Sequence, residues 1–555
     1  MKKVLLALAF ATLFINLSCK DNKPEVPVEE LAVVREWKPE DTRSLTEVSA
    51  KRGLILNTDE DTEGYVLYEP SLGTSTYLID KDGNVVHTWE SDLNSMDSYL
   101  MPNGHLFRLE RDENFPTFAS GGQAGRIREF DWEGNKVWDF KYFDEKTLLH
   151  HDFEIMPNGN ILAISYDAKT VEEAVAAGRD TSHIPKAGIW PDKIIEIEPI
   201  RPEGGKIVWE WKMWDHLVQD IDSTKANYGK ISDNPRKINI NTHGEEGPPM
   251  NEEQIKQMIQ VGFMTNNATI DNQGSDITHM NAISYNPELD QIVVSVPAYS
   301  EIFIIDHSTT TNEAKGSNGG KWGHGGDLLY RWGNPKNYGR GTEKDQKLFF
   351  QHDAKWIHKG YPGEGNITVY NNDIINPESK YPNMFAAFGV TEFPEAKLAI
   401  KDMGNYSSVV ELDPQTAENG AYEIPETEAI GPEDPSWTYI APDKYSFYSA
   451  FISGAQRLKN GNTLITQGMQ GRFFEVTPEG EIVWEYWTPY KHNYTMPDGT
   501  RPQPTGAFIF GIFRSTLHNK DYEAFNGKEL KPIDPQPETF VFKMPPKPQE
   551  STSEL

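Results

Sequence analysis

Short runs of alternating apolar and polar residues recur along most of this chain, and acidic, glycine-containing turns separate them. Residues 77–89 (YLIDKDGNVVHTW) show the unit: one alternating run, a turn at Asp82 and Gly83, and a second run that ends in Trp89. Alternation with a period of two is the pattern of a half-buried β-strand, and glycine tolerates the positive φ of a tight turn. The unit therefore predicts two antiparallel strands joined by a tight turn.

This unit occurs six times in the sequence. Clear further copies occupy residues 126–140, 193–211 and 472–486, and weaker copies occupy 301–306, with a return at 328–332, and 408–414, with no evident return strand. Most copies follow another run that ends in a Pro/Asn-Gly turn, at 101–104, 156–160 and 458–462, with looser forms at 286–291 and 361–366. An Asn-Gly pair between alternating runs is a hairpin signal.

Each repeat supplies about four short antiparallel strands, which is what one blade of a β-propeller requires. The expected fold class is therefore all-β, a six-bladed β-propeller with long inserted loops. We expect the propeller at residues 51–520 and a C-terminal extension at 521–555, with residues 223–272 as the longest loop. Loops inserted in a propeller gather on its faces and often cover a binding site.

Three histidines share one position in the repeat. His151 and His279 each lie seven residues before the asparagine of their turn, and His352 lies at the comparable place, within a residue or two. The strand that opens a propeller blade is normally the innermost, so equivalent positions in different blades face one axis. We therefore expect these histidines to converge at a central channel. The pattern leaves His150, His358, His492 and His518 unassigned.

Asp152 and Asp353 directly follow two of these histidines. Adjacent residues of a strand face opposite sides of the sheet. We therefore expect the two carboxylates to cap turns or to hold a neighbouring blade, and not to orient the histidines that precede them.

A convergent histidine cluster supports two kinds of chemistry. Imidazoles can stabilise an anion and move protons near neutral pH. Three neutral imidazoles can also bind a catalytic divalent metal. We expect an enzyme without a metal or another cofactor, and a three-histidine metal-dependent hydrolase is the alternative that the spacing leaves open.

The first residues have a different pattern from the rest of the chain. Two lysines precede an apolar run at residues 4–17, which is too short to span a bilayer comfortably and is typical of a secretory signal. The run ends just before Cys19, as in a bacterial lipoprotein signal, with the polar Asn16 as a departure. We expect a signal peptide at 1–18 and a lipid on Cys19. An ordinary cleaved signal is the alternative.

Residues 19–50 are rich in Pro, Glu and Lys and predict a flexible tether. Together these segments predict an exported lipoprotein, periplasmic or on the surface of a bacterium, that contacts the membrane through its lipid only. After the signal, the sequence has no further apolar stretch long enough to cross a membrane.

Composition narrows the classes of function. The formal net charge of −31 argues against nucleic acid as a partner, and it requires a local positive site for any anionic substrate. Cys19 is the only cysteine, which excludes an intramolecular disulfide and a thiol-based metal site. The oligomeric state is not indicated by the sequence.

Four motifs, taken in order, resemble the bacterial arylsulfate sulfotransferases, the arylsulfotransferase family. They are DITHMNAISY at 276–285 with IVVS at 292–295, FQHDAKWI at 350–357, YSSVVE at 406–411, and the stretch 448–476. The resemblance covers most of the chain from about Leu54 to Arg514. It implies a six-bladed propeller that moves a sulfuryl group from an aryl sulfate donor to a phenolic acceptor, without a nucleotide sulfate donor.

The resemblance also implies roles for individual residues. In the family, a channel histidine attacks the sulfur and is transiently sulfated, while two other histidines and an arginine stabilise the sulfate oxygens and the phenolate. His279 and His352 fall on the two supporting histidines. The family's arginine is replaced by Ser408, and its attacking histidine falls on Gly471 or Arg472.

These replacements redistribute the expected roles. Arginine stays protonated and cannot attack sulfur, but Arg472 can supply the lost positive charge. With Asp353 and Lys355 it forms the substrate-binding set that we expect. His151 is then the substitute nucleophile or general base, unless transfer is direct. A propeller that binds a sulfated or phenolic ligand without turnover is the alternative function.

Overall fold

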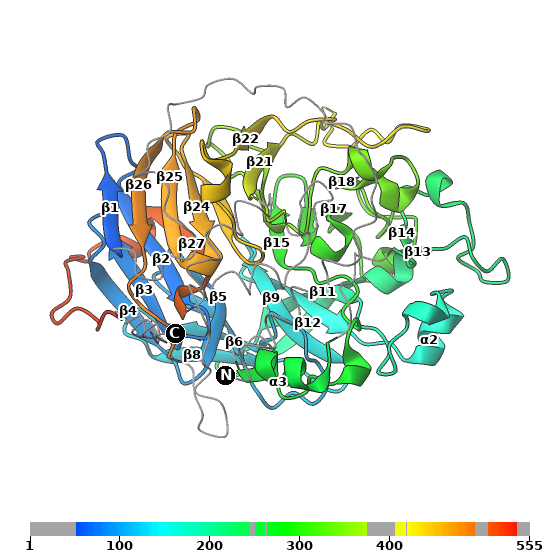
Figure 1. Ribbon diagram of the computed structural model, residues 1–555, viewed down its shortest axis with the longest axis horizontal. Helices are drawn as coiled ribbons and strands as arrows, with labels where there is room; N and C mark the ends of the chain where they lie inside the picture. The colour runs from blue at the N-terminus through cyan, green and yellow to red at the C-terminus, as the bar shows by residue number, and fades with distance from the viewer. Residues whose placement is uncertain are drawn as a thin grey trace, which may run out of the picture.

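The computed structural model describes residues 52–242, 250–260, 264–373, 406–417, 419–493 and 509–540. In these residues, six antiparallel sheets follow one another around an axis, as Figure 1 shows. The six-bladed, all-β propeller expected from the repeats is therefore confirmed. The expected signal peptide, Cys19 and tether lie outside the described residues.

Four blades are each made of consecutive strands, arranged in chain order across the sheet. The first has β5 (Asn94–Leu100), β6 (Leu106–Arg111), β7 (Gly125–Phe130) and β8 (Lys136–Lys141). The second has β9 (Thr147–Ile155), β10 (Ile161–Asp167), β11 (Asp192–Pro199) and β12 (Gly205–Lys212). The third has β15 (Ala282–Asn286), β16 (Gln291–Val296), β17 (Glu301–Asp306) and β18 (Tyr330–Trp332), and the fourth has β19 (His352–Trp356), β20 (Ile367–Asn371), β21 (Ser408–Leu412) and β22 (Trp437–Tyr439).

Both ends of the chain contribute to the other two blades. The fifth blade has β23 (Gly454–Arg457), β24 (Thr463–Gln467), β25 (Arg472–Val476) and β26 (Ile482–Trp487), and β1 (Gly53–Asn57) pairs with the outer side of β26. In the sixth blade, β27 (Ile512–Asn519) is the inner strand beside β2 (Gly64–Pro70), β3 (Ser75–Asp80) and β4 (Val85–Glu90). In Figure 1 the blue β1 accordingly lies beside the orange β26. Main-chain hydrogen bonds between the two ends of the chain thus close the ring.

The inner strands of the six blades form a closed circuit. Each contacts the inner strand of the next blade, in the order β5, β9, β15, β19, β23, β27 and back to β5. One buried apolar cluster lies between each pair of successive blades. Most of the described core is therefore divided among six blade interfaces, because each sheet is apolar on both of its faces.

A ring of tryptophans explains why the sequence repeats end in this residue. The fourth strand of each blade carries a tryptophan whose indole N–H donates to a backbone carbonyl between the third and fourth strands of the next blade, over 2.7–3.1 Å. The pairs are Trp89 with Asp131, Trp138 with Gly204, Trp211 with Gly326, Trp332 with Pro432, Trp437 with Pro478, and Trp484 with Lys81. The last pair joins the fifth blade to the sixth.

One strand was not evident from the sequence. The copy at 408–414 forms β21, and its return strand is β22, which begins only at Trp437. The long connection between them lacks the short glycine turn of the clear copies. The sequence therefore gave no local signal that β22 pairs with β21.

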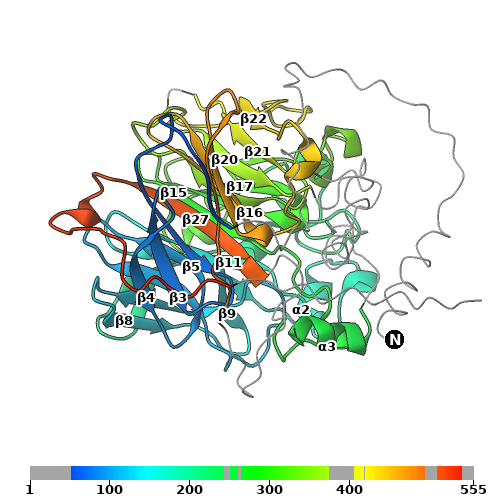
Figure 2. The same ribbon diagram turned by 60° about the vertical axis from the view of Figure 1, so that its left-hand side comes forward.

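The remaining elements lie in the connections between strands. They are the two-stranded pair β13 (Leu217–Val218) and β14 (Ile238–Asn239), the α-helices α2 (Val171–Ala176) and α3 (Glu252–Gln260), and the 3-10 helices η2 (Thr181–His183), η3 (Met213–His216), η4 (Ile231–Asp233), η5 (Ile270–Asn272), η6 (Pro297–Tyr299), η7 (Glu313–Lys315), η8 (Pro335–Tyr338), η9 (Glu343–Asp345), η10 (Lys444–Ser446), η11 (Gly468–Gln470) and η13 (Glu523–Phe525). Figures 1 and 2 both place α2 and α3 outside the blades. Among the described residues, no helix combines the length and the apolar character needed to cross a bilayer.

The start of the C-terminal extension follows the outside of the sixth blade. Phe525 contacts Tyr65 edge to face, with ring centroids 5.0 Å apart. The backbone N–H of Ile533 donates to the carbonyl of Val85, over 2.9 Å. These contacts attach the described part of the extension to β2 and β4.

Candidate active site

The structure brings the three histidines of the repeat to one place. His151 lies in β9, His279 precedes β15, and His352 is the first residue of β19. The rings of His151 and His279 meet edge to face, with centroids 4.4 Å apart. The ring of Phe513, in β27, lies 6.2 Å from His151 and 6.4 Å from His352. Four inner strands therefore contribute to this site.

The backbone at the site is strained. His151 and His279 have φ values of 57° and 55°, in the left-handed region that side chains other than glycine rarely adopt. The pairing of β9 with β10 is also irregular between Ala163 and Ser165, so β9 bulges where it carries His151. Bulges re-aim side chains, and strained residues cluster at functional sites.

His151 ends a chain of hydrogen bonds that begins at Asp192. Nε2 of His150 lies 2.9 Å from Oδ1 of Asp192, and Nδ1 of His150 lies 2.8 Å from Nδ1 of His151. A carboxylate only accepts hydrogen bonds, so Nε2 of His150 donates to Asp192. With one proton on each ring, Nδ1 of His151 then donates to His150. In this tautomer the lone pair of His151 is on Nε2.

Nε2 of His151 has no hydrogen-bond partner among the described residues. Burial of the ring, and then the positive charge of His279, hold the pKa of His151 well below its ordinary value. Gly122 lies directly against this nitrogen, and a Cβ on that glycine would overlap it. His151 is therefore a neutral imidazole. Its unprotonated Nε2 faces Gly122, where any side chain would occupy the space beside the nitrogen.

His279 is held by a carboxylate on its other nitrogen. Its Nδ1 donates to Oδ2 of Asp276 over 2.5 Å, and its backbone N–H donates to Oδ1 of the same residue over 3.0 Å. Ser120 and Tyr166 also donate their hydroxyls to Oδ2 of Asp276, over 2.6 and 2.8 Å. Asp276 is thus fixed by four donor groups, and it fixes the His279 ring in turn.

This pairing makes His279 the cation of the site. Burial opposes the charge on the ring, but the carboxylate of Asp276 outweighs burial and raises the pKa of His279. Burial likewise opposes ionisation of Asp276, but His279 lowers the pKa of Asp276 to about 2. His279 is partly exposed, whereas His151 and His352 are buried, with 3% and 2% of their surfaces exposed. His279 therefore offers a protonated Nε2 at the most accessible point of the cluster.

His352 differs from the other two because both of its nitrogens are used. Nδ1 lies 2.8 Å from Oδ1 of Asn372, and Nε2 accepts the backbone N–H of Ile452 over 3.1 Å. Burial lowers the pKa of His352 to about 3. Ile452 has a φ of 53°, so His352 holds a strained turn in place. His352 is a neutral imidazole with its hydrogen bonds already made within the protein.

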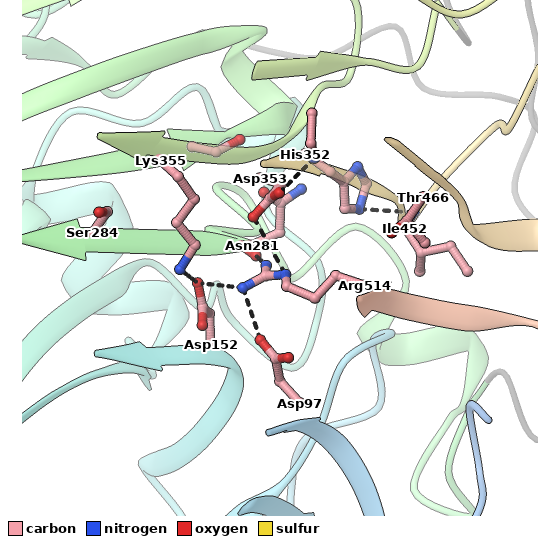
Figure 3. A network of polar contacts seen from close by, with 12 residues as sticks. Asp97, Asp152, Asn281, Ser284, His352, Asp353, Lys355, Ile452, Thr466 and Arg514 are labelled. Carbon is pink, nitrogen blue, oxygen red and sulfur yellow. Dashed lines mark hydrogen bonds and ion pairs between the residues drawn. The ribbon is translucent and has the colours of Figure 1, made fainter. Parts of the chain in front are cut away.

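Asp353 and Lys355, expected to bind substrate, lie in a buried ion network beside His352 (Figure 3). Asp353 accepts the backbone N–H of Ala455 over 2.9 Å and lies 3.3 Å from Nε of Arg514. Nζ of Lys355 donates to Oδ2 of Asp152 over 2.9 Å and to the carbonyl of Ile283 over 2.7 Å.

Asp152 and Asp353 each bind the inner strand of the next blade. Asp152 accepts the N–H of Ile283 in β15, and Asp353 accepts the N–H of Ala455 in β23. Neither carboxylate has a hydrogen bond to the histidine before it in the described structure. This agrees with the expectation that these residues hold neighbouring blades.

Arg472 is not brought to the histidines. It lies in β25, the third strand of its blade, where Nε pairs with Glu485 at 3.0 Å and Nη1 donates to Gln467 over 3.1 Å. The guanidinium also lies over the ring of Phe474, 4.2 Å from its centroid. The preceding Gly471 has a φ of 62°, and a Cβ there would overlap the carbonyl of Phe510. Neither position holds a nucleophile.

Sequence reasoning did not find four residues of the site. Asp276 lies three residues before His279, and His150 directly precedes His151, so local spacing offered a signal for both. Asp192 and Arg514 are far away along the chain, and only strand pairing brings them to the histidines. In the described part of the chain, no group of three or more His, Cys, Asp or Glu side chains is arranged to hold a metal ion.

A comparison with known protein families identifies a family for this chain. The model of the arylsulfotransferase (ASST) family matches residues 57–489. A search of curated proteins finds no significant match.

Similar solved structures include a protein of unknown function from Bacteroides caccae, with 11% identity and a TM-score of 0.39, covering 82% of this chain and 100% of that one. A β-propeller domain from Myceliophteria thermophila has 9% identity and a TM-score of 0.34 and covers 80% and 91%. Virginiamycin B lyase from Staphylococcus aureus has 10% identity and a TM-score of 0.31 and covers 80% and 89%. The family match spans most of the chain, and the protein therefore belongs to the arylsulfotransferase family.

Proposed function

We propose that this protein transfers a sulfuryl group from an aryl sulfate to a phenol, with His151 as the nucleophile and His279 as the general acid. Family membership supports the aryl sulfate donor and the phenolic acceptor. One observation carries the assignment of residues. A neutral histidine with an unpartnered Nε2 lies against a histidine that Asp276 keeps protonated, with ring centroids 4.4 Å apart.

In the first half-reaction, the lone pair on Nε2 of His151 attacks the sulfur of the aryl sulfate. An N–S bond forms and the S–O bond to the aryl group breaks. The electron pair stays on the aryl oxygen, which takes the Nε2 proton of His279, and phenol leaves. The Nδ1 proton of His151 moves toward His150, whose other nitrogen donates to Asp192. This chain of hydrogen bonds stabilises the positive charge that the attack creates on the ring.

The second half-reaction reverses these steps with a new phenol. The acceptor gives its proton to Nε2 of His279, which is now neutral, and its oxygen attacks the sulfur. The N–S bond breaks, its electron pair returns to Nε2 of His151, and the Nδ1 proton returns from His150. Both histidines regain their starting states. Charge is redistributed over an anionic, loose transition state, so a fixed cation beside the sulfur is the main means of acceleration.

This proposal gives His352 a different role from the one implied by the family resemblance. Its Nε2 accepts a hydrogen bond from Ile452 and its Nδ1 is paired with Asn372. An imidazole with both nitrogens engaged does not offer a donor to a sulfate oxygen. We therefore propose that His352 holds the turn at Ile452, and that His279 and His151 carry the chemistry.

Mass spectrometry after brief incubation with a chromogenic aryl sulfate tests the proposal. We expect a sulfuryl group on the peptide that contains His151, and its removal when phenol is added. His151→Ala loses both the adduct and the turnover. His279→Ala lowers turnover by about 10²–10³-fold, as removal of one charge-stabilising donor does.

His105→Ala is the control for these variants, because His105 is paired with Glu129 outside the site. Normal adduct formation in His151→Ala, or wild-type rates in both site variants, would refute the assignment.

A second candidate function is a propeller that binds a sulfated or phenolic ligand without turnover. Replacement of the family's arginine and attacking histidine, at Ser408 and at Gly471 or Arg472, is the observation that favours it. It predicts that an aryl sulfate raises the melting temperature while neither adduct nor product forms.

The three-histidine metal hydrolase receives less support from the geometry. It requires three imidazole nitrogens directed at one ion, and His352 has none that is unengaged in the described structure. Metal analysis of protein purified without added metal, together with activity after chelation, tests this alternative directly.

We further propose that the protein is exported and anchored by a lipid on Cys19. The apolar run at 4–17 and the single cysteine that follows it support this proposal. Metabolic labelling with a fatty acid tests it: wild type should carry the label and Cys19→Ala should not.

A further inference from the structure

A single arginine lies at the meeting point of the inner strands. Arg514 belongs to β27 and is 6% exposed. Its Nη1 lies 2.7 Å from Asp97 in β5 and 2.9 Å from Asp152 in β9, and its Nε lies 3.3 Å from Asp353 in β19. Its Nη2 donates to the carbonyl of Asn281, just before β15, over 3.2 Å. Figure 3 shows the guanidinium among these groups.

The partners of this guanidinium are sequence neighbours of the histidines. Asp152 directly follows His151, and Asp353 directly follows His352. Asn281 follows His279 by two residues. Arg514 therefore binds three segments from three blades, and each segment carries one histidine of the site.

Two further contacts strengthen the same connection. Phe513, the residue before Arg514, has its ring centroid 6.2 Å from that of His151 and 6.4 Å from that of His352. The side-chain amide of Asn281 donates to the carbonyl of Gln351, the residue before His352, over 2.9 Å. The segments around His279 and His352 are thus also joined to each other.

The bound segments need such restraint because their backbones are strained. His151, His279 and Asp353 have φ values of 57°, 55° and 57°. Such conformations persist only where the surroundings over-determine them. A planar guanidinium with a fixed fork of donors sets distance and angle at once, which a single ammonium does not.

Net stability alone does not account for this network. Asp97, Asp152 and Arg514 are all nearly inaccessible to solvent, and buried ion pairs often contribute no more than apolar residues of the same volume. What buried charges with fixed partners provide is a defined geometry. At this position, that geometry is the relative placement of three histidines.

We propose that Arg514 is the positioning residue of the active site, which holds the three histidine-bearing segments in register from the strand that closes the propeller. This inference rests on the proposed function for its consequence in catalysis, and on the contacts above for its structural content. Arg514 acts through Asp152, Asn281 and Asp353: Nη1 and Nη2 are directed at protein groups, and Nε lies within ion-pair distance of Asp353 without a hydrogen bond to it.

Arg514→Lys keeps the charge and removes the fork, so it isolates geometry. The matched control is Arg331→Lys. Arg331, in β18, is also buried, and its Nη2 pairs with Glu301 of β17 over 2.5 Å. Both variants are compared with wild type by NMR of protein labelled at histidine Cε1, assigned with single histidine variants, and by kcat and KM for an aryl sulfate.

We expect Arg514→Lys to move the resonances of His151, His279 and His352 together and to lower kcat by about 10²-fold with a smaller change in KM, because small misplacement of reacting groups has effects of this size. Arg331→Lys should leave these three resonances and kcat unchanged. If Arg514→Lys does not fold, Asp353→Asn takes its place, since it weakens one link only and should move the resonance of His352 more than that of His279.

A folded Arg514→Lys protein with unmoved histidine resonances would overturn the proposal, as would Arg331→Lys producing the same shifts. Failure of the proposed function looks different. Wild type would then lack turnover, while the histidine resonances would still report whether Arg514 positions the three segments.

Discussion

The imidazole rings of His151 and His279 lie 4.4 Å apart, centroid to centroid, and their pKa values are shifted in opposite directions. Burial and the neighbouring charge lower the pKa of His151, while Asp276 overcomes burial and raises that of His279. Two titratable groups with pKa values pushed apart are the arrangement that acid–base chemistry near neutral pH requires. The pair is therefore suited to act as base or nucleophile on one side and as acid on the other.

The pH profile of turnover should report this pair. We expect kcat/KM to fall at low pH as His151 gains a proton, and to fall at high pH as His279 loses its proton above its ordinary pKa of 6.5. Asp276→Asn removes the charge that raises the pKa of His279. The descending limb should therefore move to lower pH by about 1–3 units.

Asp290→Asn is the matched control for this measurement. Asp290 pairs with His307 over 2.7 Å, away from the site, and raises the pKa of that histidine in the same way after burial has opposed it. Its profile should coincide with that of wild type. A descending limb that stays in place in Asp276→Asn would show that His279 does not supply the proton.

A methyl group at residue 122 should disturb the nucleophile. Gly122 has a φ of 76°, and a Cβ there would overlap Nε2 of His151. We expect Gly122→Ala to displace the ring and to lower kcat/KM by about 10²-fold. Gly134→Ala imposes a similar backbone strain at a φ of 83°, but no heavy atom lies within 4 Å of its added Cβ. Equal activity in the two variants would contradict the expected contact.

The buried neutral His352 should make the protein sensitive to acid. Burial places its pKa at about 3 in the folded chain, against an ordinary value of 6.5, so below pH 6.5 only the unfolded chain binds this proton. The folded state therefore loses stability as pH falls from 6.5 toward 3, by up to about 1.4 kcal/mol per pH unit. Above pH 6.5 the imidazole of His352 is neutral in both the folded and the unfolded chain, so its titration no longer lowers the stability of the folded state.

His352→Gln removes this titration while keeping an amide that can hydrogen-bond. Urea unfolding at pH 7 and pH 5 should show that the difference in unfolding free energy between wild type and His352→Gln shrinks by about 2 kcal/mol at the lower pH. His151 contributes equally to both proteins and cancels. A difference that is independent of pH would argue against a buried neutral imidazole.

Trp484 tests the closure of the ring. Its indole is fully buried between the fifth and sixth blades and donates to the carbonyl of Lys81 over 2.9 Å. Trp484→Phe should destabilise the protein by about 1 kcal/mol through the lost hydrogen bond, and Trp484→Ala by about 3–5 kcal/mol through the cavity as well. Denaturant unfolding measures both. Similar values for the two variants would mean that the cavity does not govern stability at this interface.

Local patterning was sufficient for most of the fold. Alternating runs and glycine turns determine each hairpin from residues that are close in sequence, so β3 with β4 and β25 with β26 could be predicted. The strand β22 could not, because its pairing with β21 spans a long connection without a turn signal. The closure of the ring by β27 and β1 was equally hidden, because it joins residues more than 400 positions apart.

For the site, the repeat register was informative because equivalent positions in a ring of blades face one axis. It grouped His151, His279 and His352, but it gave no indication of their different charges or hydrogen-bond partners. Their differences come from partners on other strands: Asp192 through His150, Asp276 within its own loop, and Asn372 with Ile452 around His352.

The sequence by itself determined the number of blades and grouped the histidines that lie near one another, because both follow from periodicity repeated along the chain. Only the tertiary structure decided which nitrogens are available, which ring is charged and which arginine holds the segments together. Those properties depend on burial and on hydrogen bonds between residues that are distant in sequence. Arg514 has no periodic signal of its own, and its role appears only when the last strand completes the ring.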